Sequence, residues 1–325
     1  MKAGAWIVAV GVVLGLGIGG SAAQDYPNGP VRILVQFPPG GVPDLAGRTL
    51  AEGLTQAFGK PFIVQNLPGA NGNIATETVV KSDPDGQTLL LATSGSIAMG
   101  PAIYAKLPFD PEKDLAPITL AASFDFVMLA APDFPANSPQ ELIALAKAHP
   151  GKLTFASSGY GSEHHLSGEL FNVLTGAGLV HIPYKGFGPA TVDVMAKRVD
   201  VMFGAVPAAL PLIRGGKMKA IAVTGTSRSV ALPNVPTFEE SGVKGLVVHS
   251  WVGLMAPART PQPIIDKLDA AVIKTLHQPQ VSERFTAMSL NVLAQGPAEF
   301  ATRLDQDTKI WAKVVKDAGI KQINQ

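Results

Sequence analysis

The chain has 325 residues, of which 26 are Lys or Arg and 25 are Asp or Glu. This near-neutral balance, with no long run of one charge, gives no basis for binding nucleic acid or an anionic membrane surface. Cysteine is absent, which excludes disulfides, thiol catalysis and cysteine-ligated zinc. The length fits about two domains. The 34 Gly and 27 Pro are scattered rather than periodic, which is typical of a compact α/β protein with many turns.

Residues 1–23 have the pattern of a secretory signal peptide. Lys2 supplies a short positive region, an apolar stretch follows, and small residues end the segment at Ala23. The pattern predicts cleavage after Ala23 and export to the periplasm. The alternative is a retained transmembrane anchor, because the apolar run approaches the length of a membrane span. Glycines within the run and its small-residue end favour removal.

The next part of the chain alternates between strand and helix patterns. A β-rich run at 31–37 is closed by a proline and glycine loop, and apolar residues at helical spacing then continue to Gly59. The unit recurs, with strands expected at 62–65 and 88–93 and a helix at 73–81. Alternation with short loops predicts a parallel, doubly wound sheet.

The pattern restarts after the apolar run 126–131, which predicts a second α/β lobe. Ser138 supplies an N-cap, followed by Pro and a capping-box Glu. The elements expected there are helices at 138–149, 162–174 and 190–197, and strands at 153–156, 179–183, 199–203 and 219–224. Two last helices, expected at 261–276 and 297–318, lack a sheet of their own. We expect them to pack on the first lobe, so that lobe 1 contains 24–124 and 253–325 and lobe 2 contains 125–252.

Six short motifs occur in a characteristic order. They are Pro38 to Gly41 with Asp44 and Arg48, Asn66 to Gly72, Asp83 to Gly86, Ser157 to Ser162, His181 to Gly186, and Leu232 to Thr237 with Trp251. In this order and spacing they resemble the Bug family, also called TctC-like receptors, the extracytoplasmic solute-binding proteins of tripartite tricarboxylate transporters. The resemblance covers essentially the whole chain after the signal peptide.

The resemblance implies an α/β protein with the two-lobe type II periplasmic-binding-protein (Venus flytrap) fold, each lobe a mainly parallel sheet flanked by helices. It implies a monomer that binds a small carboxylate between the lobes and delivers it to integral membrane transporter subunits. Di- and tricarboxylates, acidic or amidated amino acids and aromatic acids are all candidates. The family has no cofactor and no catalytic residue. Val42 and Pro43 stand where many relatives carry small hydroxyl residues, so a hydroxyl contact from this loop is in doubt.

Three loops follow strands where open parallel sheets bind their ligands. Adjacent glycines admit positive φ and let an anion approach main-chain N–H groups at the start of a helix. The candidate ligand-binding residues are Phe37, Pro39, Gly40, Gly41 and Asp44 in the first loop, Ser94 and Gly95 in the second, Ser157, Ser158, Gly159, Gly161 and Ser162 in the third, and Tyr184 and Phe203 at two further strand ends.

Each candidate also has an ordinary structural interpretation. Asp44 is expected to be an N-cap or an i, i+4 partner of Arg48 rather than a ligand contact. The second loop, 94–96, is either part of the cleft or a solvated turn. Tyr184 either hydrogen-bonds the ligand or caps the core, and Phe203 is expected in the core, with a cleft wall as the lesser alternative.

The sequence also offers alternatives to simple solute binding. The group of Glu163, His164, His165 and Glu169 is interpreted as the polar start of a helix rather than a metal site, because it matches no known ligand spacing. A secreted α/β serine hydrolase would use Ser158 with a His and an Asp. However, Ser158 does not lie in the Gly-x-Ser-x-Gly turn of such enzymes. The glycines at 159 and 161 do not make a dinucleotide fingerprint, so no cofactor is predicted.

Overall fold

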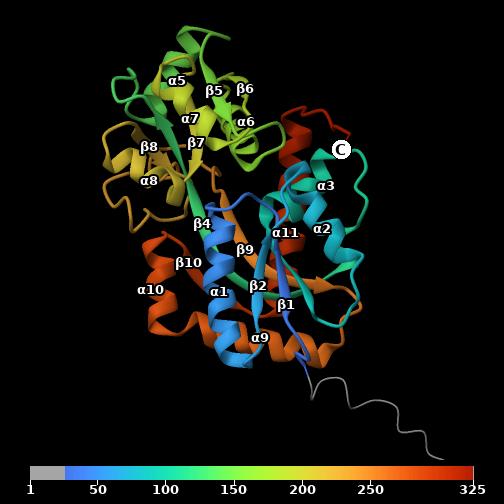
Figure 1. The fold of residues 1–325 in the computed structure, drawn as a ribbon. Helices are drawn as coiled ribbons and strands as arrows, with labels where there is room; N and C mark the ends of the chain where they lie inside the picture. The colour runs from blue at the N-terminus through green and yellow to red at the C-terminus, as the bar shows by residue number, and fades with distance from the viewer. Residues whose placement is uncertain (1–25, 325) are drawn as a thin grey trace, which may run out of the picture.

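The structure, a computed structural model that describes residues 26–324, contains two α/β lobes joined by extended strands (Figure 1). In Figure 1 the lower lobe holds the first helices and the last three, and the upper lobe holds the middle of the chain. The predicted signal peptide lies outside the described residues. Within 26–324, no helix combines the length and apolar character that crossing a membrane requires.

The elements before the first crossing are β1 (Val31–Val35), α1 (Val42–Phe58), β2 (Phe62–Asn66), the 3-10 turn η1 (Ala70–Gly72), α2 (Asn73–Val80), β3 (Thr88–Thr93), the π-helical turn η2 (Gly95–Met99), α3 (Gly100–Ile103), α4 (Pro111–Asp114) and β4 (Leu115–Ala130). The second lobe adds α5 (Pro139–Ala148), β5 (Thr154–Ser157), α6 (Glu163–Thr175), β6 (Val180–Pro183), α7 (Phe187–Met195), β7 (Val201–Ala205), α8 (Val206–Arg214) and β8 (Lys219–Val223). The chain then returns through β9 (His249–Pro257), α9 (Gln262–Leu276), α10 (Pro279–Ala287), β10 (Asn291–Gln295) and α11 (Pro297–Asp317).

The parallel units predicted from the sequence are present in both lobes. β1 pairs in parallel with β2 and β3, and β5 pairs in parallel with β6 and β7. Every residue of β3 is buried, as expected of a continuous apolar run between two neighbouring strands. The carboxyl ends of these strands carry the loops that were predicted to bind the ligand.

The sheet is nevertheless mixed, because the chain passes between the lobes twice in opposite directions. Up to Asp125, β4 pairs antiparallel with β9, and from Phe126 it pairs antiparallel with β7 and β8. β9 returns alongside β4, and its pairing begins with His249 opposite Asp125. A doubly wound parallel sheet thus describes only the β1–β3 and β5–β7 parts of the fold.

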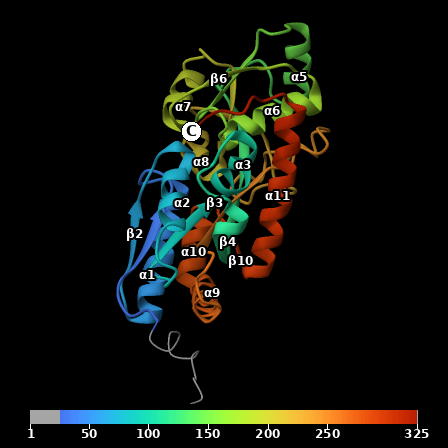
Figure 2. The same cartoon turned by 90° about the vertical axis from the view of Figure 1, so that its right-hand side faces the viewer.

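The last helices pack on elements from the first part of the chain. α9 contacts α1 and β4, and α11 contacts β4 and η2. Trp251 on β9 is completely buried, meets Phe300 of α11 edge-on at 5.0 Å, and donates from Nε1 to Asp307 Oδ2 at 2.8 Å. α11 also reaches the second lobe at α6, along the side of the molecule seen in Figure 2. The C-terminal segment touches both lobes, because Ile323 N–H donates to Ile103 O and the Tyr160 hydroxyl donates to Lys321 O.

Several elements were not predicted from the sequence. α8 contains Pro211 within the helix, which breaks the usual helical signature. β4 begins at Leu115, eleven residues before the predicted apolar run, because its first part includes Pro117 and polar residues that obscure the strand pattern. α10 and β10 are short elements within the tail.

Candidate ligand-binding site

A cavity of about 610 Å³ lies between the two lobes. Five helices begin at its wall, since Val42, Gly72, Glu163, Phe187 and Ala205 are each the first or the capping residue of α1, α2, α6, α7 and α8. The N-terminus of a helix carries partial positive charge and free main-chain N–H groups. The cavity is therefore surrounded by features that favour an anion.

The first predicted loop reaches the cavity through only part of its residues. Phe37 and Gly41 line the wall, whereas Pro39, Gly40 and Asp44 do not. Gly40 has the predicted positive φ of 87°, and its N–H donates to Asp44 Oδ2 at 2.9 Å. Gly41 is extended, with φ of −79°, so its role does not depend on a left-handed backbone.

Asp44 is a structural residue, as the sequence indicated. It forms an i, i+4 ion pair with Arg48 and accepts a hydrogen bond from Asn66 Nδ2 at 2.9 Å. Burial raises the pKa of Asp44, but the hydrogen bonds from Arg48, Gly40 and Asn66 outweigh it and bring the pKa below its usual value. The ionised carboxylate therefore holds the loop against β2.

The third loop supplies three of its five predicted residues to the wall. Ser158, Gly159 and Ser162 line the cavity. Ser157 lies beneath it, with Oγ 2.6 Å from His181 Nε2, and Gly161 packs so closely on Ile103 that a Cβ would lie 2.5 Å from that side chain. The Ser162 hydroxyl accepts from His165 N–H and caps α6.

The second loop does not reach the cavity itself but contacts Glu163, which does. Ser94 is completely buried and is absent from the wall, as is Gly95. Ser94 Oγ donates to Glu163 Oε1 at 2.5 Å, and Ser250 Oγ donates to the same oxygen at 2.7 Å. We call Glu163, Ser94 and Ser250 the cross-lobe cluster, because Ser94 belongs to the first lobe whereas Glu163 of α6 and Ser250 of β9 belong to the second. Glu163 and Ser250 do line the cavity.

The chemistry of the cross-lobe cluster depends on how strongly Glu163 is surrounded by protein. Burial raises the pKa of Glu163, and the hydrogen bonds from Ser94 and Ser250 only partly offset this effect. From the sequence, Glu163 was interpreted as part of the polar start of a helix, and its place in the cavity was not predicted. Its position at the start of the helix after the third loop was the available signal.

Ser158 and His164 form the pair that most resembles hydrolase chemistry. Ser158 Oγ lies 2.7 Å from His164 Nδ1, and burial lowers the pKa of His164 to about 4. Within the described residues, no carboxylate forms a hydrogen bond or ion pair with His164, so nothing there would stabilise its protonated form. At neutral pH the ring is an uncharged, hydrogen-bonded part of the wall.

Tyr184 and Phe203 lie away from the wall. The Tyr184 hydroxyl donates to Asp193 Oδ2 at 2.7 Å, and Phe203 is completely buried and stacks on Phe238. Lys185, next to Tyr184, does line the cavity, and its side chain is the one basic group among the described lining residues. The motif at 66–72 supplied further wall residues that had been given no role, namely Pro68, Gly69, Asn71 and Gly72.

Gly72 shows why only glycine suits the start of α2. Its φ is 94°, and a Cβ there would lie 2.4 Å from Ser96 Oγ. Gln36, buried beneath it, donates to Thr76 Oγ1 at 2.7 Å and accepts from Thr93 N–H at 3.0 Å. These contacts fasten the end of β1, the end of β3 and the start of α2 to one another at the cavity.

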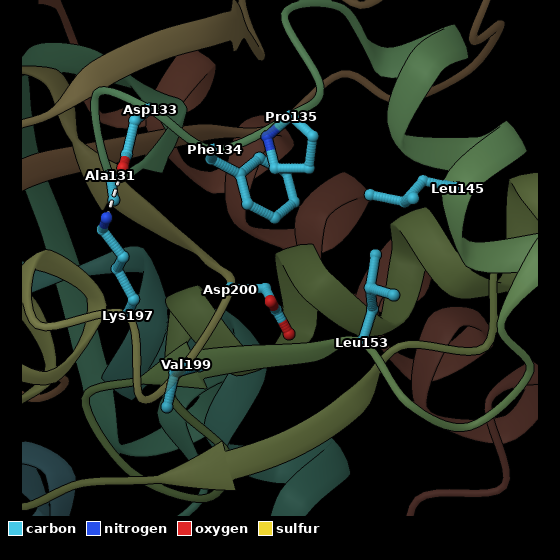
Figure 3. A pocket seen from close by; sticks show the side chains of 9 residues that line it. All are labelled: Ala131, Asp133, Phe134, Pro135, Leu145, Leu153, Lys197, Val199 and Asp200. Atoms are coloured by element: carbon cyan, nitrogen blue, oxygen red, sulfur yellow. Dashed lines mark hydrogen bonds and ion pairs between the residues drawn. The ribbon is translucent and has the colours of Figure 1, made fainter.

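A second cavity, of about 250 Å³, lies in the second lobe and contains none of the predicted residues (Figure 3). Lys197 and Asp133 form an ion pair on one side of it, and Leu145 and Leu153 line the other. Asp200 also lines it and accepts from Thr154 N–H at 2.7 Å. Two acids and one already paired base make it a poor site for a carboxylate. No group of acids and histidines suited to a metal ion is found in residues 26–324.

Comparison with known proteins identifies the family. Residues 46–320 match the family described as Tripartite tricarboxylate transporter family receptor, TctC. Protein BugT of Bordetella pertussis is 36% identical over 301 residues, which cover 92% of each chain. The structure of the periplasmic binding protein BugD is 35% identical, with a TM-score of 0.82 over 92% of this chain and 100% of that one. Rpa4515 of R. palustris, solved with adipate, is 31% identical, with a TM-score of 0.85 over 92% and 100%.

These similarities confirm the two-lobe periplasmic-binding-protein fold. They also exclude the serine hydrolase interpretation, since the family consists of receptors. The chain therefore belongs to the TctC family, the periplasmic solute-binding receptors of tripartite tricarboxylate transporters, which bind solutes and are not enzymes.

Proposed function

We propose that this chain is exported to the periplasm, closes its two lobes around a small carboxylate and delivers it to the membrane subunits of a tripartite transporter. The observation that carries the proposal is the convergence of five helix N-termini on one cavity with a single basic side chain. Such an arrangement suits an anion recognised by main-chain N–H groups. Rpa4515, of the same fold, is bound to the carboxylate adipate.

The energetics of this recognition are sufficient without a buried cation. A hydrogen bond to a charged group contributes about 1.5 to 3 kcal/mol. Three or four of them supply much of the roughly 8 kcal/mol of a micromolar complex, before the cost of ordering. Lys185 is exposed, so its charge is screened by solvent and adds less.

The proposal includes a division of the chain into two lobes. We infer that 24–124 and 253–325 form lobe 1 and that 125–252 form lobe 2, which the change in the partners of β4 at Asp125 supports. Two strands crossing side by side allow a hinge, and a ligand that binds the closed state better shifts the receptor toward it. The cavity is complete within one chain, which supports a monomer. The proposal also includes cleavage of the signal peptide, residues 1–23, after Ala23.

Three substitutions test recognition by the main chain. Gly159 has φ of 139°, a backbone conformation that residues with a side chain rarely adopt, so Gly159→Val displaces the third loop. Gly41→Val meets no such strain, but it adds a side chain at the wall. We expect both to weaken carboxylate binding at least about tenfold. Lys185→Ala should cost less.

The binding is measured by calorimetric titration with adipate, malate and citrate, after a thermal-shift screen of carboxylates. Gly151→Val is the matched control, because Gly151 has a φ of 69° and open space around it, away from the cavity. It should bind normally although it too places a side chain at positive φ. If Lys185→Ala abolished binding while both wall glycine variants bound normally, recognition would rest on the charged side chain instead.

A further inference from the structure

We propose that the preferred ligand carries its carboxylate on an aromatic ring, because the cavity between the lobes is walled by aromatic side chains contributed from both lobes. This inference rests on the proposed function and narrows the ligand class. The aromatic side chains around it are Phe37, Tyr104 and Phe124 from the first lobe and Phe126, Tyr160 and Phe187 from the second. Phe37, Tyr160 and Phe187 are at least partly exposed, whereas Tyr104, Phe124 and Phe126 are buried behind the surface. We call these six residues the aromatic wall.

The part of the aromatic wall near the crossing strands forms a continuous series of ring contacts. Phe124 and Phe126 are 5.9 Å apart between centroids, and Phe126 meets the His164 ring edge-on at 5.4 Å. His164 is in turn 5.8 Å from Phe187. Aromatic rings prefer offset or edge-on contacts at these separations. A ring-bearing ligand would extend this series at Phe187, because Phe124 and Phe126 are buried and Phe187 is partly exposed.

Packing fixes the rings that meet the cavity. The Phe187 ring lies against Gly204, where a Cβ would approach it to 2.7 Å, so the ring has a bare backbone as its support. Tyr160 packs on the His165 ring at 4.8 Å, and its hydroxyl donates to Lys321 O. A wall whose rings are already ordered loses little freedom when a ligand binds.

The charged side chains of the lining do not favour one carboxylate over another, so contacts with the ring of the ligand decide the preference. The described lining residues include one base, Lys185, and one acid, Glu163, while His164 is held by Ser158 as an uncharged ring. The formal charge of the wall therefore gives no preference for ligands with many carboxylates. A hydroxyl or an additional carboxylate placed on the aromatic wall would lose its water without gaining a partner.

The test compares benzoate with cyclohexanecarboxylate, which has equal charge but no aromatic ring, and with adipate and citrate, which carry more carboxylates and no ring. Benzoate, cyclohexanecarboxylate, adipate and citrate are titrated by calorimetry into the full receptor. We expect benzoate to bind at least about tenfold more tightly than adipate or citrate, and several-fold more tightly than cyclohexanecarboxylate. Equal binding of the two ring acids would show that the wall selects an apolar body without regard to aromaticity, and the inference would be wrong.

A variant assigns the preference to the wall. Phe187→Ala should weaken benzoate binding about tenfold and change adipate binding less than about threefold. Phe134→Ala, which removes a ring from the second cavity (Figure 3), is the control and should change neither. Tighter binding of adipate than of benzoate would overturn this inference and leave the proposed carboxylate receptor intact. Failure of every carboxylate to bind would overturn both.

Discussion

Replacing Glu163 with Gln tests the electrostatics of the cross-lobe cluster. The carboxyl oxygen Oε1 accepts hydrogen bonds from Ser94 and Ser250, and Gln presents an equivalent oxygen in nearly the same volume. What Gln lacks is the ability to ionise. The substitution therefore isolates the cost of placing an ionisable carboxyl between the lobes.

The sign of the effect follows from the raised pKa of Glu163. In the unfolded chain this carboxyl ionises near pH 4.5, whereas burial keeps it protonated to higher pH in the folded protein. Between these two pKa values the folded state binds more protons, so the free energy of unfolding falls as pH rises. The slope is about 1.4 kcal/mol for each pH unit until the folded-state pKa is reached. Below pH 4.5 both states are protonated, so this group no longer makes the free energy of unfolding depend on pH.

The expected result is a stability difference that depends on pH. Glu163→Gln should gain stability relative to the original protein as pH rises from 4 to 7.5, while any constant effect of the amide cancels from the comparison. Urea denaturation monitored by circular dichroism across this range measures it. Glu283→Gln, on the exposed surface of α10, is the control and should give a flat difference. A flat difference for Glu163→Gln as well would refute the reasoning.

Two further predictions concern the core and the N-terminus. Trp251→Phe removes the indole donor to Asp307 and should cost about 1 to 3 kcal/mol, seen as a lower Tm. Trp311→Phe, at a buried indole with no hydrogen bond among the described residues, should cost less, and equal losses would contradict the role of the Trp251 bond. Intact-mass analysis of the periplasmic protein should find Gln24 as its first residue, and the full-length chain in the membrane fraction would contradict cleavage.

The sequence by itself determined the local units and their order. Apolar periodicity placed β3 with both bounds correct and located the helices α1, α2, α5, α6, α9 and α11 to within a few residues, because these patterns depend only on neighbouring positions. The glycine loops after β1 and β5 were found from their residue types, which are equally local to the sequence. The resemblance carried by six motifs indicated the family that the comparison later showed.

The tertiary structure decided which residues face the ligand cavity. Within one loop, Ser158 and Gly159 reach the wall while Ser157 and Gly161 turn beneath it, because each side chain follows its own backbone dihedrals and neighbours. Motif order carries no information of this kind.

The structure also decided which features arise only where the two lobes meet. Tyr104, Phe126 and Phe187 are far apart in the chain and become one wall only when the crossing strands β4 and β9 bring the lobes into contact. The raised pKa of Glu163 has the same origin, since tertiary packing buries its carboxyl among residues distant in the chain. Local periodicity cannot report such properties, because they arise from surfaces that meet only after each lobe has folded.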